Sequence, residues 1–447
     1  MPKLEITLKQ HTPLIHFQHN QEGATLRASE VKPKLDRFIL TRLGENPTEE
    51  QINAGEIQYK KDHQHDQIFI PFRDLTDYEK GKFIAKGLGW LIGKGEHGAI
   101  DYKLKFVISN EPIILDIKAY SEKGKERPYP LYFGNIKKDP NNPDEYRKFS
   151  FLTDSFKAIF LCANETIKKE IKKNIAIFFL RYNFGTRQSK GFGSFYLDIT
   201  EKDKPYYVTP YYKYGFSYVT KIKNPKNYRN SRDYIEDLNQ SFLELYDMIE
   251  LFYKSIRSGL QYPFYMKPMI FKYAKSKGLQ WDKRSIKEEY YPKDLSNQII
   301  KHKSPDNLTF TQTEPEKYLF KDLFGLSVLE EWEKPYQKKI SKSNDHIDRF
   351  PSPIVFKPLR FGNRFLVNLF IEQMPEKFFG KKFTIKSNGI GNLSLKPYPD
   401  FDIEEFIIFA LKTNLKSMLG DESYVEHKQF KLLQSIYDGL NTPKIKK

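Results

Sequence analysis

The chain has 447 residues, enough for two or three domains, and its 74 lysines and arginines against 57 acidic residues give a formal net charge of +17. Such an excess favours nucleic acid or another anionic partner. The single cysteine, Cys162, excludes an internal disulfide and a zinc site built from thiolates, and the absence of a signal-peptide core or a membrane-length apolar run predicts a cytoplasmic protein.

The first forty residues have the pattern of a strand followed by a basic helix. Residues 4–9 alternate apolar and polar side chains, as in a strand. A helix is expected over residues 29–40, with Ser29 as its cap and an apolar stripe on one face. The cations of this helix lie off the stripe, at Lys32, Lys34 and Arg37. Taken alone, these cations indicate an ordinary solvated helix face and not a binding site.

The middle of the first half is predicted to be a set of strands with insertions. Six glycines between residues 81 and 98 predict a loop-rich insertion or flexible finger. Alternation predicts strands over residues 101–107 and 113–117, and residues 149–162 are also typical of strands. A helix is expected over residues 165–181.

A glycine-rich loop follows that helix and precedes a short aromatic strand. In this loop, Gly185, Gly191 and Gly193 are interleaved with Arg187 and Lys190. Glycine costs backbone entropy, so these positions indicate either turns with positive φ or exposed N–H groups that bind phosphate. The residue types alone favour neither of these two interpretations over the other. The loop is neither a Walker A motif nor a dinucleotide-binding fingerprint, because its spacing and its helix–loop–strand order differ from theirs.

The second half is predicted to contain more helix. Residues 201–234 are polar and without a clear period, so we expect a domain boundary at their start. Residues 235–260 have the pattern of one long helix, and residues 401–419 that of an amphipathic helix. Between these helices, strands are expected at residues 354–356 and 365–370.

Two sets of motifs resemble a known family. The sequence GTRQSKGFGSF resembles the G-x-R-x-x-x-G-x-G signature of the RAMP superfamily, the RNA-binding proteins of CRISPR systems. Thr12-Pro13-Leu14 and residues 26–32 match the usual start of such proteins, although Pro33 stands where the family often has glycine. Phe324-Gly325-Leu326 and the set Arg349, Ser352 and Pro353 are similar to segments of the first subunit of the Cmr (type III-B) effector complex.

The resemblance and the order of elements imply an α+β fold. We expect two ferredoxin-like (RRM-like) βαββαβ domains with insertions and a helical C-terminal part. Residues 1–200 would form the N-terminal RAMP domain, with its glycine-rich loop at 185–193, and residues 201–447 a second, degenerate RAMP-like domain with helical insertions.

The function that the resemblance implies is that of a non-catalytic RNA-binding subunit of a type III CRISPR effector complex. Its partners would be guide RNA, target RNA and the other subunits, with no membrane, and no cofactor or metal is expected. RNA phosphates would be held by a set of cations and by the backbone of the loop. This set is Lys32, Lys34, Arg37, Gly185, Arg187, Lys190, Gly191, Gly193 and Arg349.

Two other functions stay open. A metal-independent endoribonuclease that processes CRISPR transcripts would need a general base near the first helix, and His11, His16 and His19 are candidates because the pKa of histidine lies near neutral pH. Surface or packing roles are more common for such histidines. The loop at residues 19–25 contains Glu22 but no aspartate, which argues against metal-assisted cleavage. A scaffold whose basic surface binds acidic proteins is the third possibility.

Overall fold

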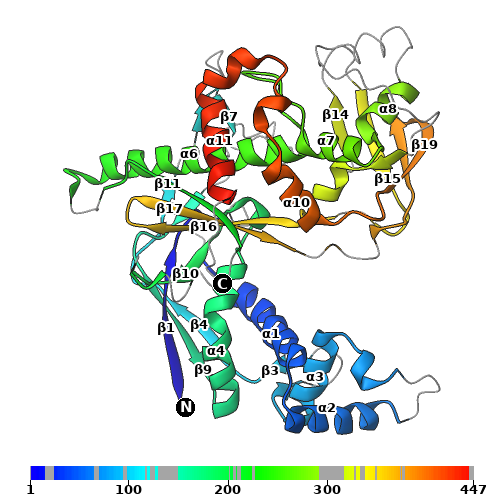
Figure 1. Cartoon of the computed structure of the whole chain (residues 1–447). Coiled ribbons are helices and arrows are strands. Elements are labelled where there is room, and N and C mark those ends of the chain that lie inside the picture. Colours follow the sequence, from blue (N-terminus) through cyan, green and yellow to red (C-terminus); the bar gives the residue numbers. More distant parts are fainter. Residues whose placement is uncertain are drawn as a thin grey trace.

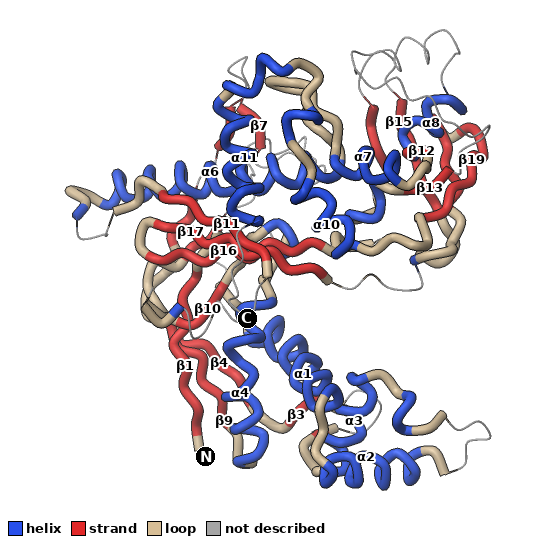
Figure 2. The backbone as a smooth tube through the Cα atoms, viewed as in Figure 1, coloured by secondary structure: helices blue, strands red, loops and turns tan. Residues whose placement is uncertain are grey.

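A computed structural model gives the structure of the chain, shown by chain position in Figure 1 and by secondary structure in Figure 2. It describes residues 2–15, 25–64, 70–93, 98–115, 118–120, 126–128, 149–200, 202–204, 208, 213–223, 227–290, 317–326, 329–332, 338–347, 350–372, 374 and 378–441. In this part of the chain, no helix is long and apolar enough to cross a membrane. The α+β class predicted from the sequence is confirmed.

A four-stranded antiparallel sheet organises the first half. Its order is β10-β1-β9-β4. The strands are β1 (Lys3–Gln10), β4 (Lys103–Val107), β9 (Phe156–Leu161) and β10 (Phe195–Leu197). Helix α1 (Ala28–Glu45) follows β1, and α4 (Glu165–Arg181) follows β9. The spatial order is therefore fourth, first, third, second strand, with one helix after the first strand and one after the third, as a βαββαβ unit requires.

Alternating side chains of this sheet separate a helix-covered face from an open face. Leu4, Ile6 and Leu8 of β1 belong to the apolar cluster that also contains Val31 of α1 and Ile171 of α4. The side chains between them on β1 point the other way, since successive residues of a strand face opposite sides. The helices α1 and α4 therefore cover one face of the sheet.

The insertion between α1 and β4 is a helical arm. Its elements are α2 (Glu49–Asp62), a short 3-10 helix (Phe72–Asp74), α3 (Asp77–Gly87), and the strands β2 (Leu91–Ile92) and β3 (Ala99–Ile100). Both α2 and α3 begin with a capping box, formed by Thr48 with Gln51 and by Thr76 with Glu79. The flexible finger predicted from the glycines is therefore wrong for residues 81–87, which lie within α3.

Glycines in the arm allow helices to pack closely. A Cβ on Gly81 of α3 would clash with the backbone oxygen of Leu40 in α1, and one on Gly44 of α1 would clash with the backbone oxygen of Asp77. The two helix backbones thus touch at these positions. Of the six glycines that indicated a loop, Gly81 instead reflects contact between two helices.

Short strand pairs complete the first half. β5 (Ile113–Leu115) pairs with β8 (Phe149–Phe151), and β6 (Lys118–Tyr120) pairs with β7 (Glu126–Pro128), both antiparallel. Leu115, Phe149 and Phe151 pack into the apolar cluster of the second half, so the two halves share buried residues.

A three-stranded antiparallel sheet organises the second half, in the order β11-β17-β16. Its strands are β11 (Tyr214–Val219), β16 (Ile354–Phe361) and β17 (Arg364–Ile371). The long helix α6 (Ser231–Arg257) follows β11, and α11 (Lys428–Asn441) ends the described chain. Both helices pack against the sheet through one apolar cluster that includes Phe252, Phe356 and Tyr437.

A second sheet is inserted into this half. Its order is β12-β13-β19-β18-β15-β14, and it lies on the far side of the molecule from β1 (Figure 1). The strands are β12 (Gln280–Trp281), β13 (Lys317–Leu319), β14 (Leu329–Trp332), β15 (Lys338–Ser343), β18 (Phe383–Ser387) and β19 (Ile390–Pro397). Helices α7 (Met269–Ser276), α8 (Asp282–Tyr290) and α10 (Ile403–Lys412) accompany it. The number of ferredoxin-like domains and the boundary at residue 200 stay predictions.

The contact between α1 and α3 generates a stability prediction with an unusual sign. In an exposed helix, Gly→Ala stabilises by about 1 kcal/mol. At Gly81 the added methyl group meets the backbone of α1, so we expect Gly81→Ala to lower the free energy of unfolding by about 1–3 kcal/mol. Urea denaturation measures it, with the neighbouring Lys82→Ala as the matched control. A Gly81→Ala variant as stable as the wild type would contradict the close packing.

Candidate nucleic-acid interface

The glycine-rich loop is built on backbone conformations that need glycine. Gly185, Gly191 and Gly193 have φ of +75°, +86° and +63°. A Cβ on Gly193 would clash with the backbone oxygen of Phe184, and one on Gly191 would lie 2.9 Å from Pro358. Arg187 also has a positive φ, +59°, which is uncommon for a residue with a side chain and indicates a constraint from its surroundings.

The loop is attached to the extended segment that follows β1. The Gly193 N–H donates to Pro13 O at 2.8 Å, and the Thr186 N–H donates to Ile15 O at 2.8 Å. The Thr12 hydroxyl donates to Gly191 O at 2.7 Å. The glycine-rich motif and the Thr12-Pro13-Leu14 motif, which both resemble the RAMP family, are therefore in direct contact. The N–H groups of Gly191 and Gly193 therefore already donate within the protein, to Gln188 O and Pro13 O respectively.

The same loop packs against the second half of the chain. The Ser194 hydroxyl donates to Pro358 O at 2.7 Å, and the Asn183 amide donates to Phe356 O at 2.8 Å. In return, Lys357 of β16 donates to Tyr182 O at 2.7 Å and to the carbonyl of Phe195 at 3.0 Å. Burial, together with the charge of Lys34, holds the pKa of Lys357 well below its usual range. These hydrogen bonds join the loop to β16.

Tyr253 of α6 is the point where the motifs of the two halves meet. The Lys190 ammonium lies 3.0 Å from the centre of the Tyr253 ring, and burial lowers the pKa of Lys190 to about 8. The Tyr253 hydroxyl donates to Phe324 O at 2.5 Å. Nearby, Arg257 donates to Gly325 O at 2.8 Å. Lys190, predicted to bind RNA, is thus buried between the halves.

The cations of α1 have three different surroundings. Lys34 donates to the Gln188 side chain at 2.8 Å and therefore lies beside the loop, and burial lowers its pKa. Lys32 faces away from the loop, because it pairs with Asp36 at 2.8 Å and donates to Ile100 O at 2.8 Å. Arg37 is exposed and lies 4.8 Å from the Tyr78 ring of the arm. The structure brings Lys34 to the loop but not Lys32 or Arg37.

One acidic side chain occupies the corner between α1 and the loop. The Gly185 N–H donates to Glu30 Oε1 at 2.7 Å, and Lys34 Nζ lies 3.7 Å from the same oxygen. An amide and an ammonium thus converge on one carboxylate oxygen, which is the arrangement that binds anions in proteins.

His11 is a poor candidate for a general base. It is 2% exposed, and its Nδ1 accepts the N–H of Arg360 at 2.8 Å. Burial, and then the charges of Lys357, Lys9 and Arg360, hold its pKa well below the ordinary value of 6.5. A buried histidine that stays neutral and accepts a backbone hydrogen bond contributes to the packing between the halves.

Several predicted residues lie outside the described part of the chain. They are His16, His19, Glu22 and Arg349. Within the described ranges, no group of three or more His, Cys, Asp or Glu residues is placed to hold a metal ion.

Sequence reasoning missed Tyr253 and Lys357, which hold the loop. Lys357 had a detectable signal, because a lysine inside the apolar run of residues 354–361 needs a buried acceptor. Tyr253 had none, since it is one of many aromatic residues in a helical pattern. Arg181 of α4 also reaches the second half, where it pairs with Glu372 at 3.1 Å.

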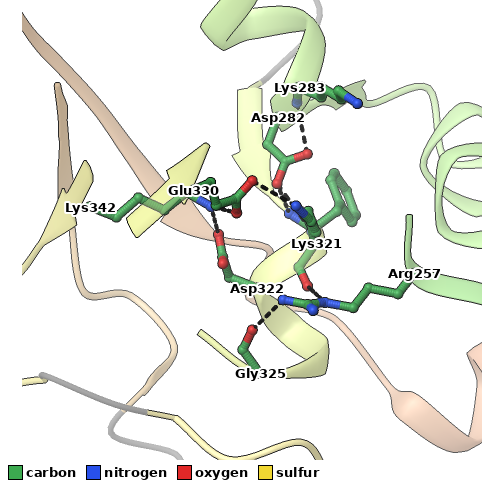
Figure 3. Close-up of polar contacts among 9 residues, drawn as sticks. Arg257, Asp282, Lys283, Lys321, Asp322, Gly325, Glu330 and Lys342 are labelled. Atoms are coloured by element: carbon green, nitrogen blue, oxygen red, sulfur yellow. Dashed lines mark hydrogen bonds and ion pairs between the residues drawn. The ribbon is translucent and has the colours of Figure 1, made fainter. Parts of the chain in front are cut away.

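A buried ion cluster near Phe324 was also missed (Figure 3). Lys342, which is 1% exposed, lies 2.6 Å from Asp322 and 2.8 Å from Glu330. Glu330 also pairs with Lys321 at 2.6 Å. Asp282 accepts the N–H groups of Phe320 and Lys321. Burial and the two nearby carboxylates raise the pKa of Asp282 to about 6, against the opposing charge of Lys342.

The ion cluster generates a prediction for stability. Removing one partner of a buried pair leaves the other charge uncompensated and costs about 3–5 kcal/mol. We expect Lys342→Met to lower the free energy of unfolding by about that amount, because Asp322 and Glu330 stay buried without their cation. Denaturant titration measures it, and Lys339→Met on the exposed side of β15 is the control. Equal stability of both variants would show that the cluster is solvated.

His11 generates a prediction for the pH dependence of stability. Because its folded pKa is lowered, the unfolded chain binds one more proton below about pH 6.5, and stability falls as the pH falls. In His11→Asn, an amide oxygen can still accept the Arg360 N–H but does not titrate. The slope of unfolding free energy between pH 5 and 6.5 should therefore decrease, by up to about 1.4 kcal/mol per pH unit. The exposed His346→Asn is the control, and an unchanged slope in His11→Asn would contradict the buried neutral state.

Two family models match this chain. One describes a Cmr1 N-terminal domain and matches residues 1–260, and the other describes a Cmr1 C-terminal domain and matches residues 265–431. No curated protein matches. A solved structure titled as the type III-B Cmr-beta complex bound to cognate target RNA contains a similar chain, with 11% identity, a TM-score of 0.28, and coverage of 93% of this chain and 98% of that chain. That TM-score is too low to show a shared fold. Because the two family models cover most of the sequence, the chain belongs to the Cmr1 family, as its motifs predicted.

Proposed function

We propose that this chain is a non-catalytic RNA-binding subunit of a type III-B CRISPR effector complex, where it binds guide RNA, target RNA or both in antiviral defence. Its membership of the Cmr1 family supports a place among the other subunits of such a complex. The net charge of +17 supports a polyanionic partner.

The anion-binding corner at Glu30 carries the RNA assignment. The Gly185 N–H and Lys34 Nζ already converge on Glu30 Oε1, at 2.7 and 3.7 Å. Arg187 follows two residues later and is partly exposed. An RNA phosphate that replaces the Glu30 carboxylate would meet the same donors, in the charge-assisted hydrogen bonds that phosphates favour. The corner therefore matches a phosphate in both charge and donor arrangement.

The residues named from the sequence divide into two roles in this proposal. Lys34, Gly185 and Arg187 contact phosphate, and the exposed Arg37 extends the basic surface along α1. Lys190, Gly191 and Gly193 shape the loop and fix it against Tyr253 and β16. Lys32, which already pairs with Asp36, supports the helix. Arg349 would act from the second half.

The non-catalytic assignment is supported by the state of His11. A general base needs an accessible nitrogen and a pKa near the working pH. The Nδ1 of His11 accepts a backbone hydrogen bond, the ring is buried, and its pKa lies well below the ordinary value. The chemistry of this residue therefore fits packing better than proton transfer.

The order of strands supports a second, incomplete ferredoxin-like domain. β11, α6, β16, β17 and α11 follow one another along the chain with insertions between them. Their sheet has the order first, third, second strand, which a βαββαβ unit has when its fourth strand is absent. We propose that residues 201–447 form this degenerate domain and residues 1–200 the complete one.

The corner generates a prediction with opposite signs for two variants. Arg187→Gln combined with Lys34→Gln removes two cations but keeps amide donors for nearby acceptors. We expect weaker RNA binding, with the slope of log K against log salt reduced by about 1.4, from about 0.7 per phosphate contact on a single strand. Glu30→Gln should instead strengthen binding, because the competing carboxylate is gone. Fluorescence polarisation with labelled single-stranded RNA across a salt series measures both.

A matched control removes two cations far from the corner. Arg232→Gln combined with Lys382→Gln lowers the net charge equally, and both positions are exposed. It should keep the wild-type affinity within about twofold. If both double variants weaken binding equally, the effect is one of net charge alone and the corner is not the site. If the wild-type chain binds no RNA at low salt, the proposed function itself is wrong.

A further inference from the structure

The open face of the first sheet carries a defined pattern of side chains. Three strands align in register, so that Lys3, Leu161 and Lys103 form one row across β1, β9 and β4. The next row is Glu5, Ile159 and Lys105, and the third is Thr7, Lys157 and Val107. Since side chains alternate along a strand, all nine point to the face that α1 and α4 do not cover.

Lysines surround an apolar centre on this face. Lys3 and Lys157 are 63% and 57% exposed, and Val107 is 41% exposed. Lys103 and Lys105 are also exposed, whereas Ile159 is buried and Leu161 half-buried on the middle strand, β9. The lysines on the two outer strands are two strand spacings apart, about 10 Å. The face is thus a basic frame around a strip of Ile159, Leu161 and Val107.

The charges of the frame are not balanced. Glu5 pairs with Lys3 at 2.9 Å and with Lys157 at 3.3 Å, and it is the one carboxylate in the three rows. Neither Lys103 nor Lys105 has an ion pair with any described residue. Four lysines against one glutamate leave a net charge of about +3 on a small area, which attracts a polyanion at ordinary salt.

We propose that this face, formed by β1, β9 and β4, is a second RNA-binding surface that takes single-stranded RNA. The proposal rests on the proposed function, since it assumes that the chain binds RNA, but it assigns a site separate from the glycine-rich loop. Phosphates pair with the four lysines, and unstacked bases or riboses lie on the apolar strip. A single strand exposes its base surfaces for such contact, whereas a duplex hides them in its stack.

None of the nine side chains on this face is aromatic, and this determines where the affinity for RNA would come from. Stacking on aromatic rings provides much of the affinity of single-strand platforms. Without it, affinity comes mainly from phosphates and depends steeply on salt, and sequence preference is weak. Figure 1 shows the lower ends of these strands pointing away from the second half of the chain, so a strand of RNA on this face can extend beyond it.

Edge protection is the structural alternative for the lysines of β4. Charged side chains on an edge strand prevent pairing with another sheet. That role explains Lys103 and Lys105, but it does not explain Lys157, which lies on the internal strand β9 between β1 and β4. The lysines extend over three strands and not along one edge, which favours a ligand.

The test compares two charge-reversal variants of the full chain. The first variant, Lys103→Glu with Lys105→Glu, reverses the charge of the two β4 lysines. The second, Lys381→Glu with Lys382→Glu, makes the same change in net charge at exposed positions before β18. The probe is a labelled 20-nucleotide oligouridylate, measured by polarisation from low to high salt, with an RNA duplex of the same length alongside. Thermal unfolding of each variant confirms that it is folded.

The proposal predicts at least a tenfold loss of oligouridylate affinity in the β4 variant and less than a threefold loss in the control. The salt slope should decrease by about 1.4 or more. Uridylate carrying a photoreactive base should cross-link to peptides containing residues 103–107 in the wild type. Equal losses in both variants, or tighter binding of the duplex than of the single strand, would overturn it.

Three further outcomes distinguish this site from its alternatives. If the wild-type chain binds the oligonucleotide and the Lys34 and Arg187 variant fails while the β4 variant does not, the face is overturned and the proposed function stands. If the β4 variant binds RNA normally but fails to join the other effector subunits, the face is a protein interface and the RNA assignment is overturned. If no RNA binds, the proposed function fails first.

Discussion

The packing of Lys190 against Tyr253 is the contact on which the arrangement of the two halves depends. The ammonium of a buried lysine lies on the face of a buried tyrosine, where the ring compensates part of the lost hydration. Around this pair, the Ser194 hydroxyl that follows the loop donates to the backbone of β16. Lys357 of β16 donates to the carbonyl groups of Tyr182 and Phe195, on either side of the loop. Because the groups on both sides are buried, separating the halves would leave polar atoms without partners, which is costly.

The loop therefore has a structural task before any ligand arrives. Gly193 lies where a methyl group would clash with the backbone of Phe184, and its N–H is already bonded to Pro13 O. The start of the loop is different, because the Gly185 N–H and the Lys34 ammonium of α1 converge on the Glu30 carboxylate. The loop can thus hold the second half with its later residues and form an anion-binding corner with α1 at its start. The basic face of β1, β9 and β4 would then provide a second, independent contact to RNA.

Local patterns in the sequence predicted the local elements well. The helix expected over residues 165–181 has those bounds in the structure, and the short aromatic strand expected after the loop is β10, Phe195–Leu197. The prediction was wrong at residues 81–87, because a glycine in a helix contact and a glycine in a loop have the same sequence signal. The site was predicted in part: helix α1 places Lys34 beside the loop, as its basic pattern indicated, but burial of Lys190 depends on Tyr253, which is 63 residues away. Such a contact has no local signal.

Hydrogen–deuterium exchange of residues 190–195 in the free chain tests this division of the loop most directly. The account predicts slow exchange without RNA, because the N–H groups of Gly191 and Gly193 are bonded to Gln188 O and Pro13 O inside the protein. Adding RNA should then change the exchange of these residues little. Rapid exchange in the free chain, followed by strong protection when RNA is added, would contradict the account and assign these glycines to the phosphates.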